Sequence, residues 1–106
     1  MNEITVQDLK EKKENGEDFF LLDVREMTEY LVSNLDGEHI PLGELPSRLS
    51  ELEDKRDAEF VVMCRSGGRS GKACELLTSN GFSNVYNLKG GITAWSKEID
   101  PSMPVA

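Results

Sequence analysis

Twelve residues near the middle of the chain, Glu59-Phe60-Val61-Val62-Met63-Cys64-Arg65-Ser66-Gly67-Gly68-Arg69-Ser70, combine the patterns of a strand, a turn and a helix start. The apolar run at their beginning is too short for a helix and is typical of a strand buried on both faces. Cys64 stands at the carboxyl end of this strand, and Gly67-Gly68 predicts a turn after it. A helix is predicted to begin near Arg69 and to end at Asn80-Gly81.

Strands and helices continue to alternate on both sides of this segment. Apolar runs predict strands at residues 19–24, 39–41 and 85–88. Capping residues and apolar spacings of three and four predict helices over residues 5–15, 26–33 and 42–54, and a last helix after Gly90-Gly91. This alternation predicts an α/β fold, in which a mostly parallel central sheet carries helices on both faces. Ligands of such sheets bind outside the carboxyl ends of the strands, where Cys64 is expected.

The length of the chain sets the domain organisation. The 106 residues suffice for a single domain over residues 1–106 and leave no room for a second one. Residues 100–106 include two prolines and follow the last predicted helix, so we expect them to form a frayed tail.

Charge and cysteine content exclude several classes of function. Twelve Lys and Arg against twenty Asp and Glu give a net charge of -8, which repels nucleic acid and anionic membranes. No apolar run reaches the roughly 18–20 residues that span a bilayer, and no secretory signal begins the chain, so a soluble, cytoplasmic protein is expected. Two cysteines and one histidine are too few for a structural zinc site. We therefore expect two reduced thiols, no metal and no cofactor.

The segment from Cys64 to Ser70 carries the predicted chemistry. Its glycines allow successive backbone N–H groups to point into one concavity, and the positive end of the following helix faces the same place. Arg65, Arg69 and Lys72 lie close in sequence, and no acidic residue occurs from residue 64 to residue 74. Such surroundings favour a thiolate and lower the pKa of a cysteine from about 8.5 into a range of roughly 3.5–7.5. The alternative is an inert cysteine buried at a strand end.

The spacing of the arginine bears on which anion would bind. Cysteine-dependent phosphatases place five residues between the nucleophile and an arginine, whereas here Ser70 holds that place and Arg69 comes one residue early. A loop shortened in this way suits an object smaller than a phosphoryl group, such as the terminal sulfur of a persulfide.

Four stretches resemble the rhodanese-like domain, the single-domain sulfurtransferase family, over nearly the whole chain. They are Leu22-Asp23-Val24-Arg25-Glu26, Ile40-Pro41-Leu42, the cysteine segment, and Leu88-Lys89-Gly90-Gly91-Ile92-Thr93-Ala94-Trp95. The segment from Ile40 to Pro46 and the Met103-Pro104-Val105 ending are similar to the C-terminal rhodanese domain of enzymes that activate sulfur-carrier proteins. One departure from the common pattern is Leu42-Gly43 after His39-Ile40-Pro41, where many members continue with Gly-Ala; it affects the wall beside the cysteine segment.

The resemblance implies a five-stranded sheet and a catalytic Cys64. The thiolate would take the outer sulfur of thiosulfate or another small anionic donor as a persulfide and pass it to cyanide, a thiol or a sulfur-carrier protein. The loop of Arg65, Ser66, Gly67, Gly68, Arg69 and Ser70 would solvate the persulfide through its amides. Arg65 and Arg69 would attract the donor, and Ser70 would donate its hydroxyl to the sulfur. No general base is required, because the nucleophile is already ionised.

Other residues have more than one interpretation. Asp23 and Arg25 occupy family positions that suggest an ion pair bracing the cysteine loop, or are merely polar residues at a strand end. Cys74 is interpreted as a core residue rather than a resolving thiol, and Trp95 as a core residue rather than a substrate platform. His39 has no evident partner and is expected on the surface or in a loop.

Two other functions stay open at this stage. One is a phosphatase or arsenate reductase that uses the same thiolate, which the early Arg69 disfavours. The other is a non-enzymatic module that docks a sulfur-carrier protein or senses oxidants through Cys64.

Overall fold

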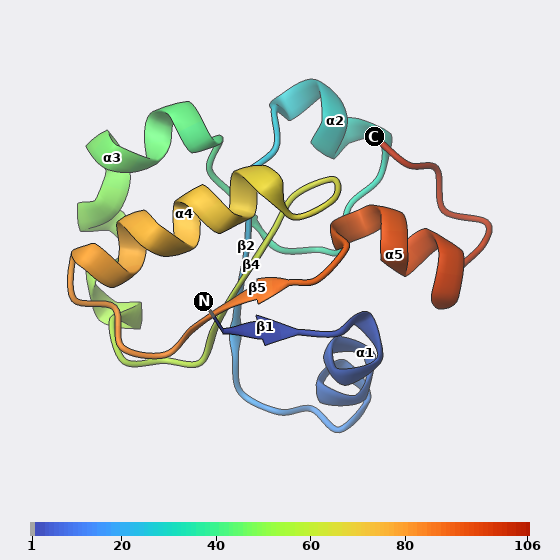
Figure 1. The fold of residues 1–106 in the computed structure, drawn as a ribbon, viewed down its shortest axis with the longest axis horizontal. Coiled ribbons are helices and arrows are strands. Elements are labelled where there is room, and N and C mark those ends of the chain that lie inside the picture. The colour runs from blue at the N-terminus through green and yellow to red at the C-terminus, as the bar shows by residue number, and fades with distance from the viewer. Residues whose placement is uncertain (1) are drawn as a thin grey trace.

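The computed structural model describes residues 2–106, which form one five-stranded sheet flanked by helices (Figure 1). The strands are β1 (Glu3–Ile4), β2 (Phe20–Asp23), β3 (Glu38–His39), β4 (Phe60–Met63) and β5 (Val85–Leu88). Their order in the sheet is β1-β5-β4-β2-β3, and every neighbouring pair is parallel. The predicted α/β class and the parallel sheet are therefore confirmed.

Helices cover both faces of this sheet, as the sequence predicts. They are α1 (Val6–Glu14), α2 (Met27–Val32), α3 (Leu45–Arg48), α4 (Gly68–Ser79) and α5 (Gly91–Glu98), with 3-10 segments η1 (Leu42–Glu44) and η2 (Leu49–Lys55). In Figure 1, α3 and α4 lie on one side of the strands, and α1 and α5 lie on the other. The segment predicted as one helix over residues 42–54 is three short helices. Pro46 lies in the first turn of α3 and lacks the N–H that would continue η1 into it.

The core consists of two clusters, one on each face of the sheet. Successive residues of a strand point to opposite faces, so Leu22 and Val62 enter one cluster while Leu21 and Val61 enter the other. The first cluster also contains Cys74, from α4, and the second contains Trp95, from α5. Burial on both faces explains why β2 and β4 are continuous apolar runs in the sequence. The positions of Cys74 and Trp95 in these clusters confirm their interpretation as core residues.

Three other parts of the fold also differ from the expectations. β1 was not predicted, because its two residues are too few to show a period. α2 is confirmed close to its predicted bounds, but Met27 and Leu31, two of the residues whose spacing predicted it, are exposed. The tail, expected to fray, lies beside α2 in the structure: the Ser33 hydroxyl donates to the Pro104 carbonyl at 2.6 Å (Figure 1).

Within residues 2–106, no helix combines the length and the apolar character that crossing a membrane would require.

Candidate active site at the carboxyl end of the sheet

The predicted site residues gather where β2, β4 and β5 end. Cys64 follows β4 directly, and the turn after it leads into α4. Asp23 is the last residue of β2, which pairs with β4, and Arg25 follows two residues later. Parallel strands bring their carboxyl ends to one edge of the sheet, which is why segments far apart in sequence meet here.

The Cys64 thiol lies inside a ring of hydrogen-bond donors. Its Sγ accepts from the Gly67 backbone N–H at 3.1 Å and from the Ser70 backbone N–H at 3.4 Å, and it lies 3.3 Å from the Ser70 hydroxyl. Gly67 has a φ of 115°, a left-handed conformation that favours glycine and turns the loop back toward the sulfur. The side chain is only 1% exposed, but it points at these dipoles and not only at the core.

These contacts determine the ionisation of Cys64. Burial raises its pKa, but the Ser70 hydroxyl and the N–H groups of Ser70, Gly67 and Ser66 together outweigh burial and leave the pKa below its usual value of 9.0. Burial without such donors raises the pKa of Cys74 to about 12. The two thiols of the chain therefore have opposite reactivities.

Alkylation by iodoacetamide is expected to distinguish the two thiols. The rate at Cys64 should rise with pH and reach half its maximum below pH 9.0, because only the thiolate reacts. Cys74 should stay unmodified in the folded protein over the same range, since its pKa is about 12 and it is buried. Peptide mass spectrometry after timed labelling measures both rates. A Cys64 midpoint at or above the ordinary value would contradict this assignment.

The start of α5 holds the carbonyl side of the cysteine loop. The Ile92 N–H donates to the Cys64 carbonyl at 3.1 Å, and the Thr93 N–H and hydroxyl donate to the Arg65 carbonyl at 3.0 and 2.9 Å. With its carbonyls turned toward α5, the loop is free to turn its N–H groups toward the sulfur. This contact requires a close approach at Gly91, where an added Cβ would lie 2.6 Å from the Arg65 carbonyl oxygen.

The substitution Gly91→Ala is therefore expected to destabilise the protein by about 2 kcal/mol, because two backbones must separate to admit the methyl group. Gly68→Ala is the matched control: Gly68 lies in the same loop, and an added Cβ there meets nothing within 4 Å. Urea unfolding of both variants measures the two costs. Equal stability of the two variants would refute the close approach at Gly91.

Asp23 and Arg25 form a buried ion pair, and both side chains are 0% exposed. The Arg25 guanidinium donates to both carboxylate oxygens of Asp23, at 2.8–3.2 Å. It also donates to the main-chain oxygens of Ser33 and Ala106, each at 2.7 Å. The pair thus fastens α2 and the tail to the end of β2.

Arg69, expected to attract an anionic donor, is bound to α2 instead. Its guanidinium donates to both carboxylate oxygens of Glu29, at 2.6 and 2.9 Å. This arginine lowers the pKa of Glu29 to about 2, against an opposing effect of burial. The exposed Arg65 has no ion-pair partner within residues 2–106. Of the two arginines expected to attract an anionic donor, Arg65 is therefore the one whose charge is not neutralised by an ion pair.

Because of the Glu29–Arg69 pair, the free energy of unfolding is expected to depend on pH in the acid range. A carboxyl whose pKa falls from 4.5 to about 2 on folding stabilises the native state above pH 4.5, and this contribution is lost as the pH falls toward 2. We expect Glu29→Gln to lower the free energy of unfolding at pH 7 by about 1 kcal/mol, since solvent partly screens the pair. The difference from wild type should shrink between pH 4.5 and 2, as measured by urea unfolding. A difference that is constant with pH would contradict the pairing.

Asn87 is a site residue that the sequence analysis missed. It lies in β5, and its side-chain amide is buried between the loop and α4. The Ser70 hydroxyl donates to its Oδ1 at 2.5 Å, and its Nδ2 donates to the Gly67 carbonyl at 3.1 Å. The available signal was a polar residue within an otherwise apolar strand that follows the cysteine strand.

His39 also has contacts that were not predicted. It lies in β3, half-buried, with Nε2 2.6 Å from the Arg25 carbonyl oxygen and its ring stacked on Tyr30 at 4.8 Å between centroids. The expectation of a surface or loop residue without a partner was wrong, because the partner is a main-chain oxygen, which carries no sequence signal.

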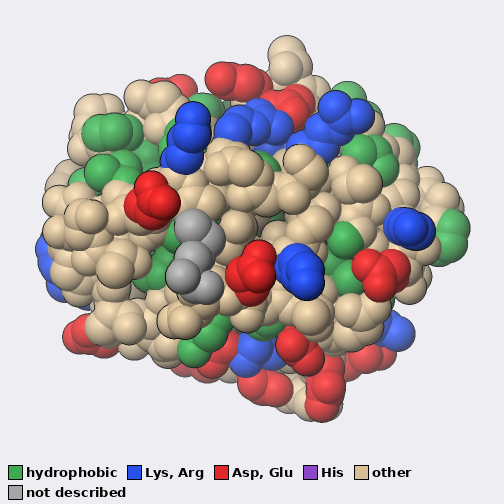
Figure 2. All heavy atoms as spheres, in the orientation of Figure 1, with side chains coloured by type: hydrophobic (Ala, Val, Ile, Leu, Met, Phe, Trp, Pro, Cys, Tyr) green, Lys and Arg blue, Asp and Glu red, His purple; other side chains and the backbone are tan. Residues whose placement is uncertain are grey.

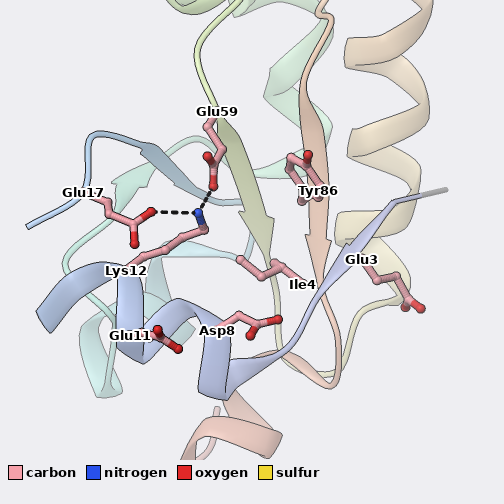
Figure 3. A pocket seen from close by; sticks show the side chains of 8 residues that line it. All are labelled: Glu3, Ile4, Asp8, Glu11, Lys12, Glu17, Glu59 and Tyr86. Carbon is pink, nitrogen blue, oxygen red and sulfur yellow. Dashed lines mark hydrogen bonds and ion pairs between the residues drawn. The ribbon is translucent and has the colours of Figure 1, made fainter. Parts of the chain in front are cut away.

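A pocket of about 410 Å³ lies at the opposite end of the sheet and does not take part in this site. Figure 3 shows its lining, in which Lys12 reaches both Glu17 and Glu59. Further acidic side chains line it, so it repels anions. In contrast, Lys and Arg side chains gather near the start of α4 (Figure 2). Within residues 2–106, no three His, Cys, Asp or Glu side chains are grouped so that they could hold a metal ion.

Comparison with known proteins identifies relatives over nearly the whole chain. The family description "Rhodanese-like domain" matches residues 5–98. The putative sulfurtransferase YtwF of Bacillus subtilis (strain 168) is 39% identical, over 95% of this chain and 96% of that protein. A crystal structure of SSP1007 from Staphylococcus saprophyticus subsp. saprophyticus is 32% identical with a TM-score of 0.81, over 93% of this chain and 97% of that one.

Other relatives are longer than this chain. The adenylyltransferase and sulfurtransferase MOCS3-2 of Zea mays is 35% identical over 96% of this chain, which spans 22% of that protein. The putative sulfur carrier protein YrkF of Bacillus subtilis (strain 168) is 37% identical over 92% of this chain, which spans 52% of it. The same kind of domain therefore occurs both at this length and as part of larger proteins.

Proposed function

The chain belongs to the rhodanese-like domain family, and from this membership we propose that it is a sulfurtransferase that carries sulfur as a persulfide on Cys64. The observation that carries the proposal is the Cys64 sulfur, which is surrounded by two backbone N–H groups and a hydroxyl. These donors stabilise negative charge on the sulfur without a general base. The same donors would stabilise a persulfide anion.

The proposed reaction has two displacement steps. The Cys64 thiolate attacks the outer sulfur of thiosulfate, the sulfur–sulfur bond of the donor breaks, and sulfite leaves with the bonding electron pair. An acceptor such as cyanide then attacks the outer sulfur of the persulfide, and the Cys64 thiolate leaves. Thiocyanate is released and the enzyme returns to its starting state, so no net oxidation of the protein occurs.

The site favours this reaction over phosphoryl transfer. A phosphatase of this type would need its arginine free to hold phosphoryl oxygens, whereas Arg69 donates both ends of its guanidinium to Glu29. A small anionic sulfur donor can instead be attracted by the exposed Arg65, so sulfur transfer does not require a free Arg69. Hydrolysis of an aryl phosphate that disappears in a Cys64→Ser variant would revive the phosphatase or arsenate reductase alternative.

The proposed acceptor in the cell is a thiol or a sulfur-carrier protein. Two relatives support this choice by name, since one is a putative sulfur carrier protein and one combines adenylyltransferase and sulfurtransferase. The proposed location is the cytoplasm, where both free cysteines of the chain would stay reduced. A carrier that binds equally well to wild type and to a Cys64→Ser variant, with no turnover, would favour the non-enzymatic docking module.

Intact mass after exposure to thiosulfate is the most direct test. The protein should gain the mass of one sulfur atom, lose it on reduction with dithiothreitol, and release thiocyanate when cyanide is added. The Cys64→Ser variant treated in parallel should gain no mass. Wild-type protein that gains no sulfur at any donor concentration would overturn the proposed persulfide mechanism.

A further inference from the structure

We propose that Asn87 is a positioning residue for Cys64: it holds the hydroxyl hydrogen of Ser70 and so keeps the resting sulfur as a thiol until Ser70 turns toward it. The inference rests on the proposed function only in taking Cys64 as the reactive group. It concerns the direction of one hydrogen bond and can be tested without any sulfur transfer.

The orientation of the Asn87 amide follows from two of its hydrogen bonds. Its Nδ2 donates to the Gly67 carbonyl at 3.1 Å, and a carbonyl oxygen can only accept. The other end of the amide, Oδ1, therefore faces Ser70 at 2.5 Å, and the hydrogen between them must come from the Ser70 hydroxyl. Asn87 and Ser70 are both buried, so solvent does not compete for this bond.

This bond uses the only hydrogen of the Ser70 hydroxyl. While that hydrogen points to Asn87, Ser70 Oγ can only accept a hydrogen bond from Cys64. The 3.3 Å contact is therefore a hydrogen bond that the Cys64 thiol donates to Ser70. Such a bond favours the thiol form, and the Ser70 hydroxyl lowers the pKa of Cys64 only in the other arrangement, in which it donates to the sulfur. When Cys64 loses its proton to solvent, Ser70 must turn its hydrogen from Asn87 to the sulfur, and the Asn87 bond is given up. Asn87 thus opposes ionisation, whereas the Gly67 and Ser70 backbone N–H groups favour it in either arrangement.

The charged groups packed around the loop leave this equilibrium undisturbed near neutral pH. Asp23 is paired with Arg25 at the end of β2, and Glu29 of α2 is paired with Arg69 of α4. The pKa of Glu29 is about 2, so its pair stays ionised throughout the titration of Cys64. Cys74, on the same helix as Ser70, stays neutral because its pKa is about 12.

The test measures the pH at which Cys64 alkylation reaches half its maximum rate. Asn87→Leu keeps the branched shape of the side chain but removes the acceptor of the Ser70 hydrogen, so Ser70 can donate to the sulfur permanently; it also removes the Nδ2 donor to the Gly67 carbonyl. We expect the midpoint to fall by at least about 0.5 pH unit. Asn87→Ala should give the same direction of change, and Asn80→Ala, an exposed asparagine elsewhere on the chain, should leave the midpoint unchanged. A midpoint that is unchanged or higher in the Asn87 variants would overturn the proposal.

Combination with Ser70→Ala separates this role from a merely structural one. In that background no hydroxyl is present to be released, so Asn87→Leu should no longer shift the midpoint. A shift that persists would show that Asn87 acts through the shape of the loop and would overturn the proposal.

The S–H stretch in the infrared spectrum provides a measurement that requires no Asn87 variant. The band of Cys64 in reduced wild-type protein should lie at lower frequency than that of an unbonded thiol, and it should move up in Ser70→Ala. An unshifted Cys64 band in wild type would refute the donated thiol. Each of these measurements can be made on a protein that transfers no sulfur. Failure of the proposed function and failure of this inference are therefore distinguishable.

Discussion

Substitution of Cys64 by serine is expected to lower thiocyanate formation at least about a thousandfold, to the background rate. Serine retains a side chain that can accept from the Gly67 and Ser70 N–H groups, so the loop should keep its shape. Its oxygen cannot carry a transferable sulfane sulfur, and its hydroxyl does not ionise near neutral pH. The loss should therefore fall on kcat, as measured by the colour of the ferric thiocyanate complex.

The matched control for this prediction is Cys74→Ala. Cys74 is the only other cysteine of the chain and lies on the core side of α4, in the cluster that also contains Leu77. Its removal should leave kcat within about twofold of wild type and cost about 1 kcal/mol of stability, since a small cavity is created. If both variants lost activity equally, loss of packing rather than loss of the nucleophile would be the explanation. Activity that survives Cys64→Ser would remove the nucleophile from the proposed mechanism.

The parts of the fold that were predictable are those in which each segment carries its own signal. β2 and β4 are buried on both faces, and this burial leaves a continuous apolar run in the sequence. The Thr5 cap of α1 was predictable for the same reason, because its hydroxyl accepts from the Asp8 N–H only three residues away. β1 gave no such signal, since its pairing with β5 depends on residues more than eighty positions later.

The same distinction between local and distant contacts applies to the candidate site. The Cys64 loop was predictable because its nucleophile and its donors lie within seven residues of one another. The Arg69–Glu29 pair joins residues forty positions apart, and nothing local to Arg69 shows that its charge is already taken. Asn87 reaches Ser70 from β5, seventeen positions later in the chain. Sequence therefore predicted the site residues that lie close together along the chain, whereas only the structure reveals Asn87 and shows which groups neutralise or position one another.

Loss of Arg25 is expected to cost about 3–5 kcal/mol of stability, the largest effect on folding of any substitution considered for this chain. Arg25→Ala would leave the Asp23 carboxylate buried without its partner, at a position that is 0% exposed. It would also leave the Ser33 and Ala106 main-chain oxygens without the donor that reaches each at 2.7 Å. The first loss acts in the interior, where solvent cannot replace the missing group, and the second acts at part-buried positions.

Arg48→Ala provides the matched control, because Arg48 is an arginine of the same chain that pairs with Glu44 and Glu51 at the surface. Its loss should cost no more than about 1 kcal/mol, since exposed ion pairs contribute little. Urea unfolding at pH 7 compares the two variants directly. The double variant Asp23→Leu with Arg25→Met should be more stable than Arg25→Ala alone, because no unpaired charge is then buried. Equal costs for Arg25→Ala and Arg48→Ala would mean that the pair at the end of β2 is not what fastens α2 and the tail to the sheet.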